Sequence, residues 1–130
     1  MLLFIVGYKE ININCGCPSP KVAGSGCFGA SLMFSPSVVR EMVLRMSEHC
    51  NKVTVKCRIG VDAHDSYQEL VDFIQTLSEG TAATHFIIHA RKAILKMSPD
   101  KNRKIPPLNY EVVYQLVRDF PHLDFTLNGG

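Results

Sequence analysis

Four short apolar runs recur along the chain, and each of them gives way to polar residues. They cover residues 11–14, 53–57, 85–89 and 125–128. In the first run, Ile11 and Ile13 alternate with Asn12 and Asn14, at the period of two that places successive side chains on opposite faces of a strand. Each run therefore predicts a β-strand that ends in polar residues.

Segments with helical periodicity separate the predicted strands. Ser35 and Pro36 predict the N-cap and first residue of one helix, and Ser66 with Glu69 has the capping-box spacing at the start of a second. A third helix is predicted to begin near Asn109, after two prolines. The apolar positions expected to face the core are Val38, Met42 and Met46 in the first helix, Leu70, Phe73, Ile74 and Leu77 in the second, and Val112, Val113, Leu116 and Val117 in the third.

The strict alternation of predicted strands and helices defines the expected fold class. Such alternation favours right-handed βαβ units and a parallel sheet, so we expect an α/β protein. No low-complexity linker divides the 130 residues, and residues 1–130 are expected to form a single domain.

Side chains that can do chemistry gather at the C-terminal ends of the predicted strands. Gly16 tolerates a positive φ and Pro18 has no N–H to donate, so the chain leaves the sheet here and Cys17 lies on a turn. Carboxyl ends of parallel strands share one edge, where ligands bind in sheets and barrels of this class. The side chains that make this edge the predicted active-site face are Asn14, Cys17, Lys56, Arg58, His89, Arg91 and Asn128.

Composition is that of a globular domain, with 46% apolar and 20% charged residues. The net charge of +2 does not by itself indicate a nucleic-acid or membrane partner. Locally, however, six of the fourteen basic residues fall within residues 91–104, against one acid, Asp100. Such a segment suits contacts with phosphate groups, although a run of charges is also typical of an ordinary solvated surface.

The cysteines favour a reducing compartment. There are five of them, an odd number, and the sequence has no N-x-Ser/Thr motif, so we expect a cytoplasmic or organellar protein (plastid or mitochondrion), not a secreted one. The apolar run at residues 1–6 is far shorter than the roughly 20 residues of a membrane helix. Cys15, Cys17 and Cys27 lack a fourth ligand at the usual spacing, so no metal site is predicted.

Several motifs together resemble the tRNA-dihydrouridine synthases, specifically the DusA-like branch. They are INCGCPSPKVAGSGCFGASLM, VTVKCRIG, FIIHARKA, IPPLNYEVVYQLVRDFPHL and the closing LNGG. The resemblance implies a (β/α)₈ TIM barrel that binds FMN, a following helical domain, and reduction of a D-loop uridine of tRNA to dihydrouridine with NADPH. The four strands align with the family's fourth to seventh, so the chain is expected to be a partial barrel, a fragment without the flanking strands and helical domain.

The same resemblance implies a role for individual residues. Cys17 matches the catalytic cysteine that gives a proton to C5 of the uracil ring. A thiol suits this role, because its ordinary pKa of about 8.5 leaves it mostly protonated near neutrality. The residues implied in cofactor binding are Asn14, Lys56, His89, Asn128, Gly129 and Gly130. Candidates for tRNA contact are Arg58, Arg91 and Lys92.

Two other functions stay open from the sequence. A catalytically inactive, tRNA-binding remnant would bind tRNA in a salt-sensitive way without flavin absorbance. Another flavin TIM-barrel oxidoreductase, acting on a small molecule, would have an activity that tRNA does not affect. The turn at Cys17 and the basic segment favour the tRNA-modifying enzyme over both.

Overall fold

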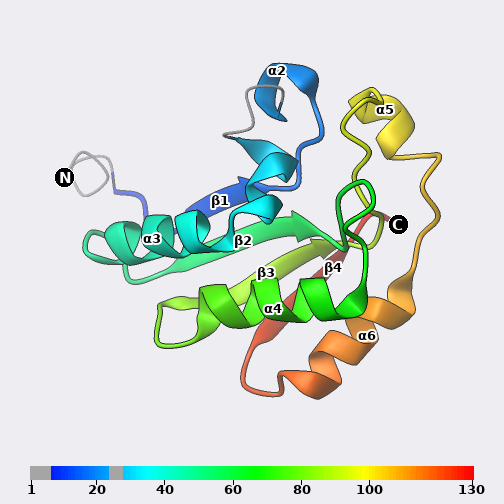
Figure 1. Cartoon of the computed structure of the whole chain (residues 1–130). Helices are drawn as coiled ribbons and strands as arrows, with labels where there is room; N and C mark the ends of the chain where they lie inside the picture. Colours follow the sequence, from blue (N-terminus) through cyan, green and yellow to red (C-terminus); the bar gives the residue numbers. More distant parts are fainter. Residues whose placement is uncertain (1–6, 24–27) are drawn as a thin grey trace.

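The sheet of this protein has four parallel strands in sequential order, β1-β2-β3-β4 (Figure 1). The computed structural model describes residues 7–23 and 28–130. The strands are β1 (Ile11–Cys15), β2 (Val53–Arg58), β3 (Ala83–His89) and β4 (Asp124–Asn128). All four predicted strands are confirmed, with ends that differ by no more than two residues from those expected. The α/β class is confirmed as well.

Three longer helices connect the strands and lie along one face of the sheet (Figure 1). They are α3 (Pro36–Ser47), α4 (Tyr67–Ser78) and α6 (Tyr110–Asp119), at the positions that the periodicity predicted. Three short helical segments were not predicted: α2 (Pro20–Ala23), the 3₁₀ helix η1 (Gly29–Phe34) and α5 (Pro99–Asn102). All three lie in the connections beyond the C-terminal ends of β1 and β3, so they are placed to shape a site there.

The two faces of the sheet differ sharply in chemistry. Toward the helices the strands present a core of fully buried apolar side chains, among them Val55, Phe86 and Ile88. Toward the other face they present polar side chains, and the parallel register places Asn14 beside Lys56 and Arg58 beside His89. The helix-covered face therefore holds the fold together, and the polar face is free to carry a site.

Not every predicted core position is correct. In α3, Met42 and Met46 pack against the core as predicted, but Val38 is 52% exposed, and the fully buried positions are Val39 and Val43. In α6, Val113 and Leu116 are buried as predicted, whereas Val117 is 50% exposed. All four apolar positions predicted for α4 are buried.

No helix in the described part of the chain combines the length and the apolarity needed to cross a membrane. The apolar run at residues 1–6 and Cys27, which entered the predictions above, lie outside the described residues.

Candidate active site

The C-terminal ends of all four strands border one cavity of about 610 Å³, which we call the strand-end cavity. The predicted site residues that line it are Asn14, Cys17, Lys56, Arg58, His89, Arg91, Asn128, Gly129 and Gly130. Nine of the ten side chains or backbone positions singled out from the sequence are thus brought together, although they span more than 110 residues of chain.

The turn that carries Cys17 is held by hydrogen bonds on both sides of the cysteine. Asn14 Oδ1 accepts from the backbone N–H groups of Gly16 at 3.0 Å and Cys17 at 3.1 Å, an arrangement typical of Asx turns. The Cys17 carbonyl accepts from the N–H of Ala30 at 2.8 Å. Gly29 has a φ of +60°, and a Cβ there would collide with the same carbonyl, so glycine is required at this close approach. The backbone of the thiol-bearing residue is therefore fixed.

Cys17 is also set apart by its exposure. Among the four described cysteines it is the one whose side chain is not buried. Cys15 and Cys57 lie on the helix-covered face, where burial raises the pKa of the Cys15 thiol to about 12 and raises that of Cys57 as well. Only Cys17 presents a thiol to the strand-end cavity, whereas the other described cysteines behave as core residues.

The cavity lining is strongly cationic. In the described residues it holds Lys56, Arg58, Arg91 and Arg103 and no carboxylate. Arg103 belongs to the basic segment noted in the sequence but was not among the predicted site residues, and its position in this segment was the only signal for it. Its guanidinium also lies 3.7 Å from Asp100 on the exposed side of α5. Such a lining selects an anionic or strongly electron-rich ligand.

His89 lies at the back of the cavity with an unused polar atom. The residue is only 7% exposed, and its buried Nε2 has no hydrogen-bond partner in the described structure. Burial, reinforced by the nearby cations Arg58 and Lys56, lowers the pKa of His89 to about 4, so the ring is neutral near pH 7. A neutral imidazole can donate or accept at that atom, depending on its tautomer.

The backbone after β4 closes tightly on this ring. Gly129 has a φ of +103°, and a Cβ at this position would lie 2.5 Å from His89 Cδ2. Only glycine can bring the chain so near, and the space beside it is open to the strand-end cavity. His89 and residues 128–130 together form a cradle for part of a ligand.

All three predicted tRNA-contact residues already donate hydrogen bonds within the chain. Lys92 does not line the cavity, because its Nζ donates to Asp65 Oδ2 at 2.7 Å and to the Asp62 carbonyl at 3.2 Å. Arg58 does line the cavity, but it is only 4% exposed and its guanidinium donates to backbone carbonyls, one of them that of Gly16. Arg91 is half-buried, with Nη1 donating to the Pro106 carbonyl at 2.9 Å.

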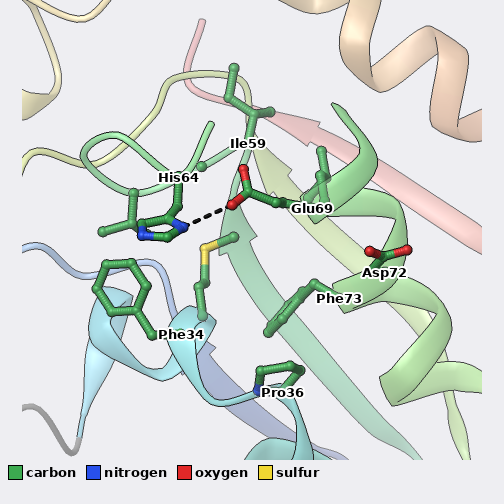
Figure 2. A pocket seen from close by; sticks show the side chains of 11 residues that line it. Phe34, Pro36, Ile59, His64, Glu69, Asp72 and Phe73 are labelled. Carbon is green, nitrogen blue, oxygen red and sulfur yellow. Dashed lines mark hydrogen bonds and ion pairs between the residues drawn. The ribbon is translucent and has the colours of Figure 1, made fainter. Parts of the chain in front are cut away.

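A second cavity, of about 560 Å³, lies between η1, the loop after β2 and the start of α4. Figure 2 shows that Phe34, Ile59 and Phe73 line it and that His64 points to Glu69, at an Nδ1–Oε1 distance of 2.8 Å. Its lining is mostly apolar and includes none of the predicted site residues. Its histidine is paired with Glu69, and none of the residues predicted to do chemistry lies there.

Parallel strands with alternating helices, and a polar cavity at the strand ends, are typical of α/β proteins that bind ligands there, in open sheets and in barrels alike. The dihydrouridine synthase family model matches residues 4–130. The chain therefore belongs to the dihydrouridine synthase family, and its four-stranded sheet is consistent with a partial TIM barrel of that family.

Individual relatives agree with this assignment. The tRNA-dihydrouridine(20/20a) synthase of Escherichia coli (strain K12) is 54% identical over 126 residues, which are 95% of this chain and 36% of the relative. The enzyme of the same name from Salmonella typhi is 54% identical, with 95% and 38% covered. That of Vibrio cholerae is 52% identical, with 95% and 38% covered. The chain thus spans less than two fifths of the length of these relatives.

Proposed function

We propose that this chain is the central part of the FMN-binding barrel domain of a tRNA-dihydrouridine synthase, which reduces a D-loop uridine to 5,6-dihydrouridine with NADPH as the reductant. The observation that carries the proposal is the meeting of the Cys17 thiol with Lys56, His89 and the 128–130 backbone in one cavity. These residues come from separate family motifs, and the fold gives them a common site.

The residues present fit an anionic flavin mononucleotide. Lys56 would lie beside the isoalloxazine ring, and His89 with Asn128, Gly129 and Gly130 would hold the phosphate end, for which the unpartnered Nε2 and the glycine cradle are suited. The excess of cations over carboxylates in the lining favours the phosphate charge. When bound, the reduced flavin supplies hydride to C6 of the uracil ring.

Cys17 would supply the proton that completes the reduction. Hydride at C6 and a proton from the Cys17 Sγ at C5 together saturate the C5–C6 double bond. Asn14 would orient the base with its amide nitrogen, because its amide oxygen is already occupied by the N–H groups of Gly16 and Cys17. The backbone hydrogen bonds of Gly16, Cys17 and Ala30 that hold this turn support such a role for the thiol.

The tRNA would be held mainly through its phosphate groups. Arg91 and Arg103 line the cavity, and further exposed cations follow in residues 96–104; contacts of such groups with phosphates give affinity without reading sequence. Contacts of Lys92 and Arg58 with tRNA stay predictions. We place the reaction in the cytoplasm or an organelle, where the tRNA substrate is.

A chimera tests the proposal directly. The matched 126-residue segment of the Escherichia coli relative is replaced by that of this chain, in a strain that lacks the relative, and tRNA dihydrouridine is measured by mass spectrometry. We expect dihydrouridine to form, and Cys17→Ala to slow its formation at least about 100-fold, because general-acid groups contribute factors of that size. Cys57→Ala is the matched control and should keep the activity, since Cys57 lies on the other face.

Other outcomes would contradict the proposal in distinct ways. A chimera that binds tRNA but forms no dihydrouridine would support the tRNA-binding remnant. Full activity of the Cys17→Ala chimera would remove the cysteine from the mechanism. Flavin-dependent turnover of small molecules that tRNA does not change would support a different flavin barrel enzyme.

A further inference from the structure

Arg58 is a buried cation that contacts uncharged groups only. Its Nε donates to the Gly16 carbonyl at 2.9 Å, and its Nη1 donates to the carbonyls of Asn102 at 3.1 Å and Lys92 at 3.3 Å. Burial lowers the pKa of Arg58 to about 10; the nearby Cys17 opposes this shift and the repulsion of Arg91 and Arg103 adds to it, so Arg58 stays charged near neutrality. Burying a charge among neutral partners is unfavourable for stability, so a buried arginine that borders the strand-end cavity is a candidate for a task in the site.

Asn102 organises the loop that Arg58 contacts. Its side chain is completely buried, and its Nδ2 donates to the carbonyls of Ile94 at 2.9 Å, Met97 at 2.8 Å and Ser98 at 3.1 Å. Its Oδ1 accepts from the N–H of Ile94 at 2.8 Å. One amide side chain thus fixes the backbone of residues 94–102, which leads into Arg103 on the cavity wall. The main-chain carbonyl of Asn102 is a separate group, and it accepts from Arg58.

These contacts form one continuous link between two loops that differ in task. The link runs from the Asn102 side chain through its carbonyl to the Arg58 guanidinium, and from there to the Gly16 carbonyl beside Cys17. We propose that Arg58 and Asn102 are positioning residues that clamp the cationic loop 91–104 to the Cys17 turn. The clamp holds bound tRNA at a fixed position relative to the thiol. The clamp rests on the proposed function for its catalytic meaning, but its geometry can be tested without it.

The clamp depends on the fork of the guanidinium. Nε and Nη1 donate to carbonyls of two different loops at once, which a lysine ammonium at the end of a single flexible stem does not reproduce. Arg58→Lys therefore keeps the charge and loses the bridge, and Asn102→Ala loosens the loop while leaving Arg58 in place. A matched control is Arg40→Lys, because Arg40 also donates to two carbonyls, those of Thr76 at 2.7 Å and Glu79 at 2.6 Å, far from the cavity.

Kinetics of the chimera give the first measurement. Arg58→Lys and Asn102→Ala should each lower kcat by about 10- to 100-fold, the usual result of a small misplacement of a reacting group, with the KM for tRNA changed by less than about threefold because the exposed cations remain. The kcat of the double variant should lie within about twofold of that of the slower single variant, because both changes break the same link. Arg40→Lys should leave both parameters unchanged.

Hydrogen exchange of the 130-residue chain gives a second measurement that needs no activity. Peptides covering residues 14–19 should lose protection at least about tenfold in Arg58→Lys and in Asn102→Ala, and keep it in Arg40→Lys. If Arg58→Lys does not fold, Asn102→Ala still decides the matter. A wild-type kcat in Arg58→Lys, additive losses in the double variant, or unchanged protection of residues 14–19 would each overturn the clamp. An inactive wild-type chimera with the expected loss of protection would instead reject the proposed function alone.

Discussion

The two faces of the same sheet are built for opposite purposes, although they alternate residue by residue along each strand. On the helix-covered face, Phe86 and Ile88 are fully buried in the core. On the polar face of the same strand, His89 lines a cavity that Lys56 and Asn14 also line. Because side chains alternate in direction, one strand supplies stability with one set of positions and chemistry with the next.

A second contrast separates the core from the loops above it. The core is stabilised by apolar packing, whereas the loops after β2 and β3 are joined by hydrogen bonds together with a small apolar cluster of Ala30, Val61 and Ala93. Ala93 donates to the Gly60 carbonyl at 2.9 Å, Asp62 to the Ala93 carbonyl at 2.8 Å, and the Leu95 N–H to Asp62 Oδ1 at 3.0 Å. The polar end of the sheet is therefore positioned by directional bonds, which fix geometry more closely than apolar contacts do.

The strongest test of the contrast between faces uses two adjacent residues of β3. Phe86→Ala should lower the free energy of unfolding by about 3–5 kcal/mol, because it leaves a cavity in the core. Ile87→Ala should cost no more than about 1.5 kcal/mol, because Ile87 is only half-buried on the polar face. Urea unfolding followed by circular dichroism measures both, since the chain has no tryptophan for fluorescence.

Equal losses in these two variants would show that the polar face is as well covered as the helix side. Phe86→Leu provides a milder core change if Phe86→Ala does not fold. For the side-chain volume that it removes, it should lower the free energy of unfolding by more than Ile87→Ala does.

The next largest effect is a pH dependence that arises from His89. The folded state holds His89 neutral down to about pH 4, whereas an unfolded histidine binds a proton below about pH 6.5. The stability that this neutral ring contributes is therefore complete above about pH 6.5 and is lost as the pH falls from there toward 4. Urea unfolding at a series of pH values should show a decline for the wild type that is reduced in His89→Gln.

The comparison with His89→Gln isolates one residue. Both proteins keep the other four histidines, so their titration cancels in the difference between the two curves. If the difference in free energy of unfolding between the two proteins does not change between pH 6.5 and 4, the lowered pKa of His89 and the burial that causes it are contradicted.

The sequence predicted the sheet and the site rim well because their signals are local. α4 was predicted correctly down to its buried face, since its capping box fixes the first residue and the apolar spacing admits one face. In α3, Val38 and Val39 are both apolar, so periodicity allowed two faces, and packing on the sheet selected that of Val39. Their positions at the strand ends singled out most of the site residues, and the family resemblance added their individual roles.

The clamp could not be predicted from the sequence, and the reason is physical. Arg58 was noted as a basic residue at a strand end, but its partners are carbonyls 42 and 44 residues away, which every residue possesses. Asn102 likewise contacts only the backbone. Side-chain identity gives no signal for contacts of this kind, because only the folded path of the loops determines them.

The smallest predicted effect compares the first turns of α3 and α4, two of the three helices on the apolar face. Ser66 Oγ accepts from the Glu69 N–H at 3.2 Å, and Glu69 Oε2 accepts from the Ser66 N–H at 3.1 Å, so the predicted capping box is present. Ser35 is the N-cap of α3, as predicted, but its side chain makes no capping bond. Ser66→Ala should therefore cost about 1 kcal/mol in urea unfolding, and Ser35→Ala only a few tenths. Equal costs would mean that local capping is unimportant here and that packing on the sheet alone holds both helices.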